Sequence, residues 1–445
     1  MIFHIILRAS CRFVWLLPFA ALTGCGVYGT FRSPQTEITN DAFGPADNTD
    51  SLSTGDLRWQ ELFSDPHLAA LIDSALCNNA DLQTARLKVE EAQAQLRSSR
   101  LAYLPSVDFS ASAVHNDGTW DVQLPVNASW EIDLFGSLRN AKRGRLAALL
   151  ASEAYAQAVQ SQLVATVAST YYTLLALDAQ REVYVETEQS WARNVEVTRR
   201  LMEAGRYNAA SLAQTEASYC SIRNNLVEID RQIRQTENQL CSLLGWTPRT
   251  IKRGGLDEWR APEQLSVGIP LRVLSRRPDV RQAEQTLAEA FYATNQARAD
   301  FYPSITLSGS YDLRHTLSEV VGSFLQPIFQ RGTLRANLRV AKAQEQQAEI
   351  AFRQTVVEAG IEVNDALLDV ESARAKAENY ARQVGHLRTA VESTRLLMQH
   401  GSTTYLEVLT AQQTLLEAQI GQIANRLSEI SGVITLYQAL GGGVR

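Results

Sequence analysis

The sequence lacks a long hydrophobic run and a large excess of charge of either sign. Its longest uncharged apolar stretch, residues 13–22, has about ten residues, whereas a helix that crosses a bilayer needs about 20. The 42 Lys and Arg residues face 48 Asp and Glu residues, for a net charge of -6. These absences exclude a helical membrane protein. They also argue against a nucleic-acid partner, because no basic excess is available to neutralise a phosphate backbone.

Cysteine and histidine are also scarce, and their positions favour neither a disulfide framework nor a metal site. Beyond the N-terminal region the cysteines are Cys77, Cys220 and Cys241, an odd number for an exported chain. Cys220 and Cys241 lie 21 residues apart in one expected helix, about 30 Å, which is too far to bridge. The six histidines have no Cys or carboxylate at metal-ligand spacing. We therefore expect no metal and no cofactor.

The sequence contains no recognisable catalytic constellation. It has no nucleophile-base pair, no glycine-rich phosphate loop and no clustered carboxylate pair with a plausible pocket. We therefore expect a protein that is not an enzyme.

The first 24 residues have the layout of an export signal. They contain no Asp or Glu, carry Arg8 and Arg12 ahead of the apolar stretch, and end in Leu-Thr-Gly before Cys25. This ending resembles a bacterial lipobox, in which the cysteine is lipidated, and several acyl chains would anchor the protein durably. Gly26 suggests, by analogy with lipoprotein sorting, delivery to the outer membrane. The alternative is an ordinary signal peptide followed by a chance cysteine.

An internal duplication spans nearly all of the mature sequence. Sliding the sequence against itself by 198 and then by 196 residues aligns proline and glycine residues that stand at apparent element boundaries. The matches include Pro105-Ser106 with Pro303-Ser304, Gly136 with Gly332, Gly205 with Gly401, and Leu244-Gly245 with Leu440-Gly441. Chance can supply alanine matches, but not boundary residues in the same order. We infer two copies of one structural unit.

Each copy contains a segment of 68 residues without proline, 137–204 and 333–400. An interior proline breaks a helix, and both segments are rich in Ala, Glu, Gln and Leu. Each could therefore form a single helix of roughly 100 Å, at about 1.5 Å per residue. Gly205 and Gly401 fit helix C-caps, and each precedes a turn and a further helix of about 35 residues. We predict one very long helical hairpin in each copy.

Ahead of each long helix the periodicity changes from helical to alternating. Apolar and polar residues alternate between Trp120 and Ile132, and segments 107–113 and 305–311 continue the pattern. Residues 317–327 alternate poorly, although a fourth strand is expected there. About ten such residues, when tilted, span the apolar band of an outer membrane, with the tryptophan-bearing face toward lipid. The alternative is a pair of hairpins packed on a soluble core.

Both predicted parts require more than one chain. An apolar stripe runs along the second long helix from Phe352 to Met398. No globular sequence is available to cover it, so it must pack on other helices, most simply on copies of itself. Four strands are too few to close a membrane barrel, because known barrels begin near about eight strands. The periodicity of the sequence does not determine whether two, three or four chains assemble.

Three motifs give the sequence a resemblance to a known family. They are Arg276-Arg277-Pro278-Asp279-Val280-Arg281 before a helix, Tyr302-Pro303-Ser304-Ile305 at a strand, and Gly401-Ser402-Thr403-Thr404-Tyr405-Leu406-Glu407-Val408-Leu409 after the long helix. With the duplication, they make the chain similar to the TolC-type outer-membrane efflux proteins, in particular the lipidated branch that serves resistance-nodulation-division (RND) pumps. For the first motif we expect a structural role, with proline in the first helical turn and Asp at the positive end of the helix dipole.

The resemblance implies a mainly α fold with a membrane β part. Long helical hairpins would form an α-barrel in the periplasm, and four strands per protomer would contribute to a 12-stranded β-barrel in a trimer. The corresponding domains are a signal peptide (1–24), a lipidated N-terminal extension (25–64), repeat 1 (65–247), a linker (248–269) and repeat 2 (270–445). The strands are expected at about 106–133 and 304–327, and the long helices at about 137–245 and 333–441.

The resemblance also places functional residues at the far ends of the hairpins. The turns at Gly205 and Gly401 would be periplasmic tips where an adaptor docks. By match to the family motif, Leu406, Glu407 and Thr410 fall at the constriction that closes the tunnel. An Asp is common in the family at the position of Thr410. Because this chain has Thr there, Glu407 is the one carboxylate among these three residues. The alternative for Glu407 is an ordinary solvated charge on a helix.

The implied function is the outer-membrane exit duct of a tripartite efflux system. A homotrimer, lipid-anchored at Cys25 and spanning the outer membrane, would pass small molecules such as drugs from the periplasm to the exterior. Its partners would be a periplasmic adaptor, also called a membrane fusion protein, and an inner-membrane pump that supplies the energy. Alternatives within transport are type I secretion and metal-ion efflux, and the absence of His or Met clusters argues against metal specificity.

A structural coiled-coil envelope lipoprotein without a pore is the alternative from another class. It would explain the long helices and Cys25, but it would leave the alternating strands without a purpose. The adaptor itself is disfavoured, because no compact β domain is visible between the expected helices.

Overall fold

The computed structural model describes residues 28–34, 54–260, 275–312, 318–328, 330–400 and 403–444. The predicted signal peptide, Cys25, Gly401 and parts of the predicted N-terminal extension and linker lie outside the described residues. The chain forms two compact units, and each is described by itself. Unit 1 holds residues 91–151 and 284–351 together with 28–34. Unit 2 holds residues 54–90, the described part of 152–283, and 352–444.

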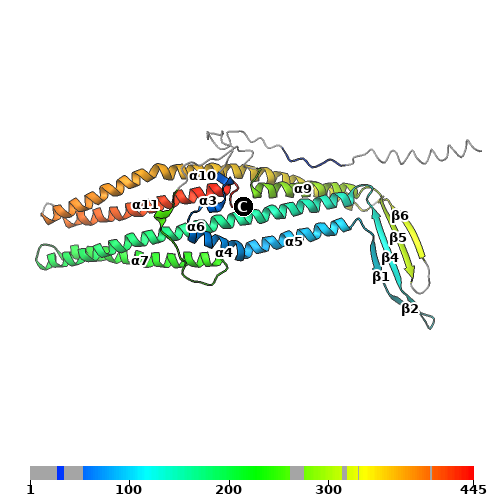
Figure 1. The fold of residues 1–445 in the computed structure, drawn as a ribbon, viewed down its shortest axis with the longest axis horizontal. Helices are drawn as coiled ribbons and strands as arrows, with labels where there is room; N and C mark the ends of the chain where they lie inside the picture. Colours follow the sequence, from blue (N-terminus) through cyan, green and yellow to red (C-terminus); the bar gives the residue numbers. More distant parts are fainter. Residues whose placement is uncertain are drawn as a thin grey trace, which may run out of the picture. The chain divides into compact units, whose positions relative to one another are not determined.

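The helices repeat in matched pairs (Figure 1). The pairs are α5 (Ala80–Leu101) with α9 (Pro278–Ala299), 22 residues each, α6 (Ser137–Glu203) with α10 (Thr333–Gln399), 67 residues each, and α7 (Ala209–Leu243) with α11 (Tyr405–Ala439), 35 residues each. The remaining described helices are η1 (Thr54–Asp56), α3 (Trp59–Leu62), α4 (Pro66–Asn78) and η2 (Leu256–Glu258). Equal lengths in both copies confirm the predicted duplication and the two long helical hairpins. Along the described residues, no helix is both long enough and apolar enough to cross a bilayer.

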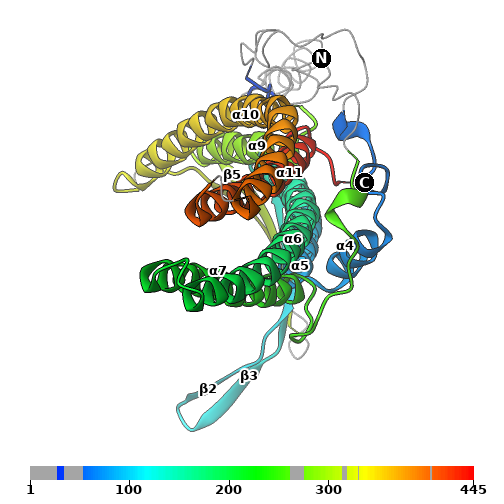
Figure 2. The same cartoon turned by 90° about the vertical axis from the view of Figure 1, so that its left-hand side faces the viewer.

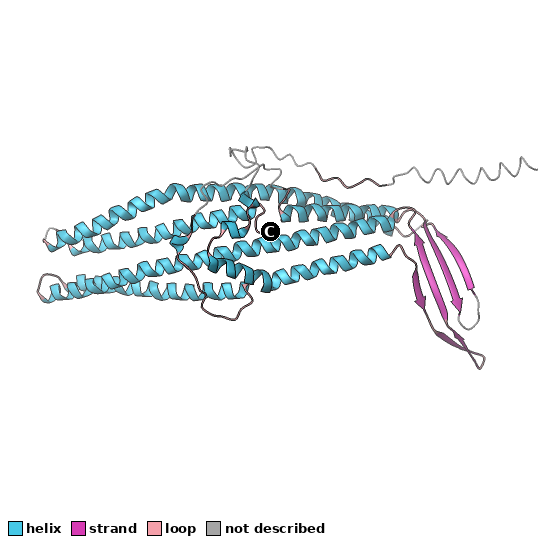
Figure 3. Ribbon diagram, in the orientation of Figure 1, coloured by secondary structure: helices cyan, strands magenta, loops and turns pink. Residues whose placement is uncertain are grey.

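Unit 1 contains a four-stranded antiparallel sheet, whose strands are magenta in Figure 3. The strand order is β1-β4-β5-β6. Its strands are β1 (Ser106–Phe109), β4 (Pro125–Ile132), β5 (Ser304–Asp312) and β6 (Ser318–Leu325). A separate hairpin of β2 (Ser112–Asn116) and β3 (Thr119–Gln123) extends the first two strands. Asp117 and Gly118, both with positive φ, form its two-residue turn, a pairing that the twist of antiparallel hairpins favours. The fourth predicted strand is therefore present as β6.

The strand register separates the two faces of this sheet. Trp130 pairs with Leu307, and Leu307 pairs in turn with Gly322. Because directly opposed residues share a face, one face is apolar except at Ser318, which pairs with Tyr311. Its other members are Val107, Phe109, Val126, Ala128, Trp130, Ile132, Ile305, Leu307, Gly309, Tyr311, Val320, Gly322 and Phe324. Val320 is 74% exposed and Phe324 is 68% exposed, so none of the described residues covers the β6 part of this face. The alternation of β6 is poor because Val321 falls on the opposite, polar face.

Unit 2 has the larger hydrophobic core. In this unit α6, α7, α10 and α11 lie side by side, and α4 packs on one side of them (Figure 2). Tyr171, Leu240, Ile434 and Tyr437 are almost fully buried there. The Tyr437 hydroxyl donates to the carbonyl oxygen of Leu57 at 2.9 Å, which fastens the segment before α3 to α11. Burial of this kind supplies most of the stability of long helices, whose propensity alone is marginal.

The Arg-Arg-Pro-Asp motif has the predicted structural role. Pro278 is the first residue of α9, and Asp279 lies in its first turn. The buried Arg277 guanidinium contacts Asp279 at 2.7 Å, Glu362 of α10 at 2.6 Å and the carbonyl oxygen of Ala439 at 2.8 Å. These contacts join the start of α9 to α10 and to the end of α11.

Candidate functional site

The turn between α6 and α7 is built by a glycine cap. Gly205 has φ of 70°, a conformation that costs glycine little. Its N–H donates to the carbonyl oxygen of Met202 at 2.9 Å, and the Arg206 N–H donates to that of Leu201 at 2.9 Å, which is the Schellman pattern. Asn208 then caps α7, accepting from the Ser211 N–H at 2.9 Å. The turn at Gly205 is thus a short, well-satisfied end of the hairpin in unit 2.

The second hairpin brings the three predicted constriction residues onto one face. In the first two turns of α11, Leu406, Glu407 and Thr410 are exposed, and Leu406 is 55% exposed. The Glu407 carboxylate accepts hydrogen bonds from the hydroxyls of Thr403 and Thr404. The Thr410 hydroxyl donates to the carbonyl oxygen of Leu406 at 2.9 Å. The role of this face as a constriction stays a prediction, and Gly401 itself lies outside the described residues.

The opposite face of α11 closes a buried aromatic cluster, which the sequence pattern did not predict. Trp191, Ile222, Tyr405 and Leu409 are buried together, and Tyr207 lies beside them with its ring centroid 6.0 Å from that of Tyr405. We call these five residues the seam cluster, because they join the first hairpin to the second within unit 2. The buried residues Tyr405, Val408 and Leu409 have helical spacing, a signal that could have identified this face.

Hydrogen bonds between α6 and α11 also connect the two hairpins next to the seam cluster. The Asn194 side-chain amide donates to the Gln412 carbonyl at 2.7 Å, and the Gln412 amide donates to the Ser190 hydroxyl at 3.4 Å. Within the first hairpin, the Tyr219 hydroxyl donates to the Glu188 carboxylate at 2.6 Å. This hydrogen bond to a carboxylate raises the pKa of Tyr219 above its ordinary value.

Two buried donors in the seam cluster lack a well-formed hydrogen bond. Within the described part of the chain, neither the Trp191 Nε1–H nor the Tyr405 hydroxyl has a partner in hydrogen-bond geometry. The hydroxyls of Thr198 and Thr215 lie near that of Tyr405, but each donates at 2.8 Å to a carbonyl of its own helix. Burial raises the pKa of Tyr405, and the two threonines oppose this only in part. A buried donor without a partner costs about 1–3 kcal/mol. Aromatic packing therefore stabilises the closed arrangement of the seam cluster, and the two unpartnered donors destabilise it.

Ion pairs connect the segment after α7 to the first hairpin. Arg253 contacts Asp178 of α6 at 2.9 Å and the buried Glu237 of α7 at 2.6 Å. In the second hairpin Arg426 contacts Glu429 at 2.9 Å and donates to the carbonyl oxygen of Trp259 at 2.8 Å. The segment from Arg253 to Trp259 therefore holds both hairpins of unit 2.

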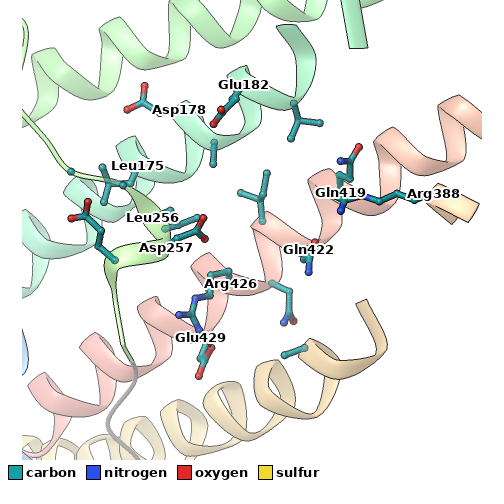
Figure 4. Close-up of a pocket in the computed structure, with 18 residues that line it drawn as sticks. Leu175, Asp178, Glu182, Leu256, Asp257, Arg388, Gln419, Gln422, Arg426 and Glu429 are labelled. Atoms are coloured by element: carbon teal, nitrogen blue, oxygen red, sulfur yellow. Dashed lines mark hydrogen bonds and ion pairs between the residues drawn. The ribbon is translucent and has the colours of Figure 1, made fainter. Parts of the chain in front are cut away.

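This segment also borders a pocket of about 800 Å³ in unit 2 (Figure 4). Its lining mixes carboxylates, including Glu182 and Asp257, with Arg388 and Arg426. No histidine, cysteine, serine or threonine is among the described residues that line it, so it offers no nucleophile-base pair of the kind that acyl or phosphoryl transfer uses. The arrangement suits hydrogen bonding to a polar partner.

The thiols and carboxylates are dispersed. Across the residues that the structure describes, no group of three or more His, Cys, Asp or Glu side chains could hold a metal ion. Cys77, Cys220 and Cys241 are free thiols.

Comparison with known families identifies a match along both copies of the duplication. The family model described as "Outer membrane efflux protein" matches residues 71–246 and 269–442.

Three curated relatives are similar over almost their whole length. Cation efflux system protein CusC of Escherichia coli (strain K12) is 30% identical over 466 residues, covering 96% of this chain and 99% of that protein. A solved structure of CusC matches with a TM-score of 0.80 at 27% identity, covering 94% of this chain and 100% of that one. Toluene efflux pump outer membrane protein TtgC of Pseudomonas putida is 30% identical over 458 residues, covering 95% of this chain and 93% of that protein. Probable outer membrane lipoprotein SilC of Salmonella typhimurium is 29% identical over 432 residues, covering 92% of each.

Proposed function

The chain belongs to the outer membrane efflux protein family, and we propose that it works as a trimer that forms the exit duct of a tripartite efflux system. It is an outer-membrane efflux channel. The single observation that carries the proposed trimer is the open sheet of unit 1. Among its described strands, that sheet has two unpaired edges and an apolar face whose outer residues Val320 and Phe324 are largely exposed.

The sheet edges argue for closure by identical chains. On the described residues, β1 pairs only with β4, and β6 pairs only with β5. Exposed strand edges are templates for pairing, and closure into a barrel removes them. Joining β6 of one protomer to β1 of the next repeats one contact around a ring. Three copies would give 12 strands, about the size at which a membrane barrel has an open lumen.

The stripe predicted from Phe352 to Met398 does not need a second copy for much of its length, because Phe352, Val363 and Val370 are buried within the chain by its own packed helices. A second apolar row on α10, exposed in the single chain, supports the assembly instead. Val357, Ile361 and Leu368 are exposed in the single chain and follow a four- and seven-residue spacing that places them on one face of the helix. Such a stripe is stable in water only when another helix covers it. In the proposed trimer, the first hairpin of a neighbour covers it.

The tips supply the gate of the proposed duct. The seam cluster holds the two hairpins of one protomer together, and the turns at Gly205 and Gly401 offer the adaptor its docking site. Leu406, Glu407 and Thr410 would line the narrowest point, where three copies of Glu407 repel anions and attract cations. Adaptor binding would bias the closed seam toward an open one, because a ligand shifts an equilibrium by its preference for one state.

An acylated Cys25 would anchor the N-terminal extension to the membrane. The name of SilC identifies that relative as a probable outer membrane lipoprotein, and the lipobox-like sequence before Cys25 suggests the same modification here. The predicted division into extension, two repeats and a linker at 248–269 remains part of this proposal.

Small organic molecules are the proposed cargo, with a separate inner-membrane pump as the source of energy. Relatives named for toluene and for cations are equally similar, so cation efflux is the second candidate. The chain has only three methionines and six histidines, and soft metals favour such ligands. We infer transport rather than catalysis, because the family to which the chain belongs consists of efflux channels.

Conductance and export separate these proposals. The purified full-length protein, reconstituted in planar bilayers, is expected to give unitary currents, and a deletion strain is expected to become sensitive to organic drugs or dyes. Sensitivity to copper or silver alone would favour cation efflux. Absence of any current from an assembled, detergent-solubilised protein would contradict the duct and favour a structural lipoprotein.

A further inference from the structure

Two segments of unit 1 carry positive charge only. Residues 134–151, at the start of α6, and residues 326–344, at the start of α10, each contain four basic residues and no acidic one. The members are Arg139, Lys142, Arg143, Arg145, Arg331, Arg335, Arg339 and Lys342. We call these eight residues the basic belt. Arg139 and Arg143 match Arg335 and Arg339 at the repeat shift of 196, so the pattern occurs in both copies.

This charge pattern opposes the local preferences of a helix. Neither α6 nor α10 has an acidic residue in its first turn, although the N-terminal end of a helix favours negative charge. Arg335 and Arg339 are also like charges four residues apart, an arrangement that destabilises a helix. A partner of opposite charge would offset this cost.

The chain itself compensates the belt only in part. Asp133 caps α6, where its carboxylate accepts from the N–H of Leu138 at 3.2 Å and that of Arg139 at 2.9 Å. Among the described residues, however, no ion pair holds a belt side chain, and Arg145 donates to the neutral Gln95 at 3.0 Å. Most of the positive charge is therefore left for a partner outside the chain.

The belt lies where the sheet meets the helices. β4 ends at Ile132 and β6 ends at Leu325, so both basic segments begin within a few residues of the apolar sheet. Two of the belt cations rest on aromatic rings. Lys142 lies 5.4 Å from the Tyr103 ring centroid, and Arg143 lies 5.9 Å from that of Tyr292. Basic and aromatic side chains beside an apolar band are typical of the headgroup level of a membrane.

Two residues of the described N-terminal segment pack beside α9 and the start of α6. Phe31 packs against Phe291 with ring centroids 5.7 Å apart, and Tyr28 packs against Gly136 just before α6. Cys25 precedes Tyr28 by three residues, which can span at most about 11 Å. An acyl chain on Cys25 would therefore enter the bilayer beside the basic belt. This step rests on the proposed lipidation, whereas the charge pattern does not.

We propose that the basic belt binds the phosphate headgroups of anionic phospholipids, such as phosphatidylglycerol, in the periplasmic leaflet of the outer membrane. The belt supplies the cations, and the sheet accepts the acyl chains on its apolar face. This placement rests on the proposed membrane-spanning barrel. Bound anionic lipid removes the repulsion among the eight cations of each chain and fixes the depth of the protein in the membrane.

Native mass spectrometry of the full-length protein tests this proposal. The protein is held in detergent micelles containing equal amounts of phosphatidylglycerol and phosphatidylcholine with the same acyl chains. Retained lipid should be mainly phosphatidylglycerol, and the preference should fall as salt rises. Each basic residue near an anionic surface contributes about fivefold in affinity, so Arg335→Gln with Arg339→Gln should weaken retention about thirtyfold.

Matched variants decide where the lipid binds. Arg382→Gln with Arg395→Gln makes the same charge change on exposed residues of α10 in unit 2 and should retain the lipid. Arg335→Lys with Arg339→Lys keeps the charge and should retain it as well. If the glutamine pair does not assemble, Arg139→Gln with Arg143→Gln tests the matching positions on α6.

The outcomes separate lipid binding by the basic belt from the proposed anchor at Cys25 and from the proposed duct. Equal retention of both lipids, or unchanged retention after loss of the belt charges, would overturn it. Cys25→Ser should keep the preference for phosphatidylglycerol, and loss of the preference in that variant would assign it to the anchor instead. Conductance in a bilayer of phosphatidylcholine alone tests the duct separately, so the duct can fail while lipid binding persists.

Discussion

Tyr405 offers the sharpest test of the proposed gate. Its ring is 3% exposed and contacts Tyr207 in the seam cluster. Truncating a buried aromatic ring to alanine costs about 3–5 kcal/mol, of which aromatic pairing accounts for about 0.5–1.5 kcal/mol. The Tyr405 hydroxyl lacks a well-formed hydrogen bond, so its removal returns about 1–3 kcal/mol. Tyr405→Ala should therefore destabilise the closed seam by about 2 kcal/mol, which is about a thirtyfold shift toward the open state.

Tyr405→Phe is the matched control, because it keeps the ring and removes only the hydroxyl. We expect the alanine variant to raise mean single-channel conductance in planar bilayers and the phenylalanine variant to leave it unchanged or lower it. The double variant with Tyr207→Ala should raise conductance by less than the two single changes combined, since both remove the same contact. Equal conductance of wild type and Tyr405→Ala would refute the assignment of the seam cluster as the gate.

Three further predictions concern other sites. Glu407→Ala should raise conductance or weaken block by divalent cations, and no change in either places Glu407 away from the constriction. Arg277→Met should lower the free energy of unfolding by about 1–3 kcal/mol, because it leaves the buried carbonyl oxygen of Ala439 without its donor; thermal unfolding measures this, and an unchanged midpoint would contradict the structural role of the motif. Burial raises the pKa of Tyr437 to about 12. The neutral phenol therefore stabilises the fold fully below about pH 10, and this contribution is lost as pH rises toward 12. Tyr437→Phe should show a flatter decline of unfolding temperature across this range, and parallel declines would count against the assignment.

The sequence predicted the helices and strands well because their signals are local. Proline-free segments and glycine caps located the 67-residue helices to within a residue or two, since a proline or a positive φ acts on its own turn. Alternation located the strands for the same reason. It was weakest for β6, where Val321 lies on the polar face and Gly322 on the apolar one.

The seam cluster could not be predicted in this way. Trp191, Ile222 and Tyr405 lie far apart along the chain, and only the packing of two hairpins brings them together. The constriction is even harder to predict from the sequence, because the narrowest point of a tunnel depends on how several chains assemble. Leu406 and Glu407 share an exposed face in one chain, which is necessary for that role but leaves it a prediction.

The apolar sheet face and the open strand edges make one claim central: identical subunits join to enclose a hollow path across the outer membrane. The most direct test is the current carried by the purified full-length protein in a planar bilayer. A hollow assembly should give discrete current steps of uniform size, from a particle that needs detergent to stay in solution. A stable single subunit that remains soluble without detergent and carries no current would contradict it.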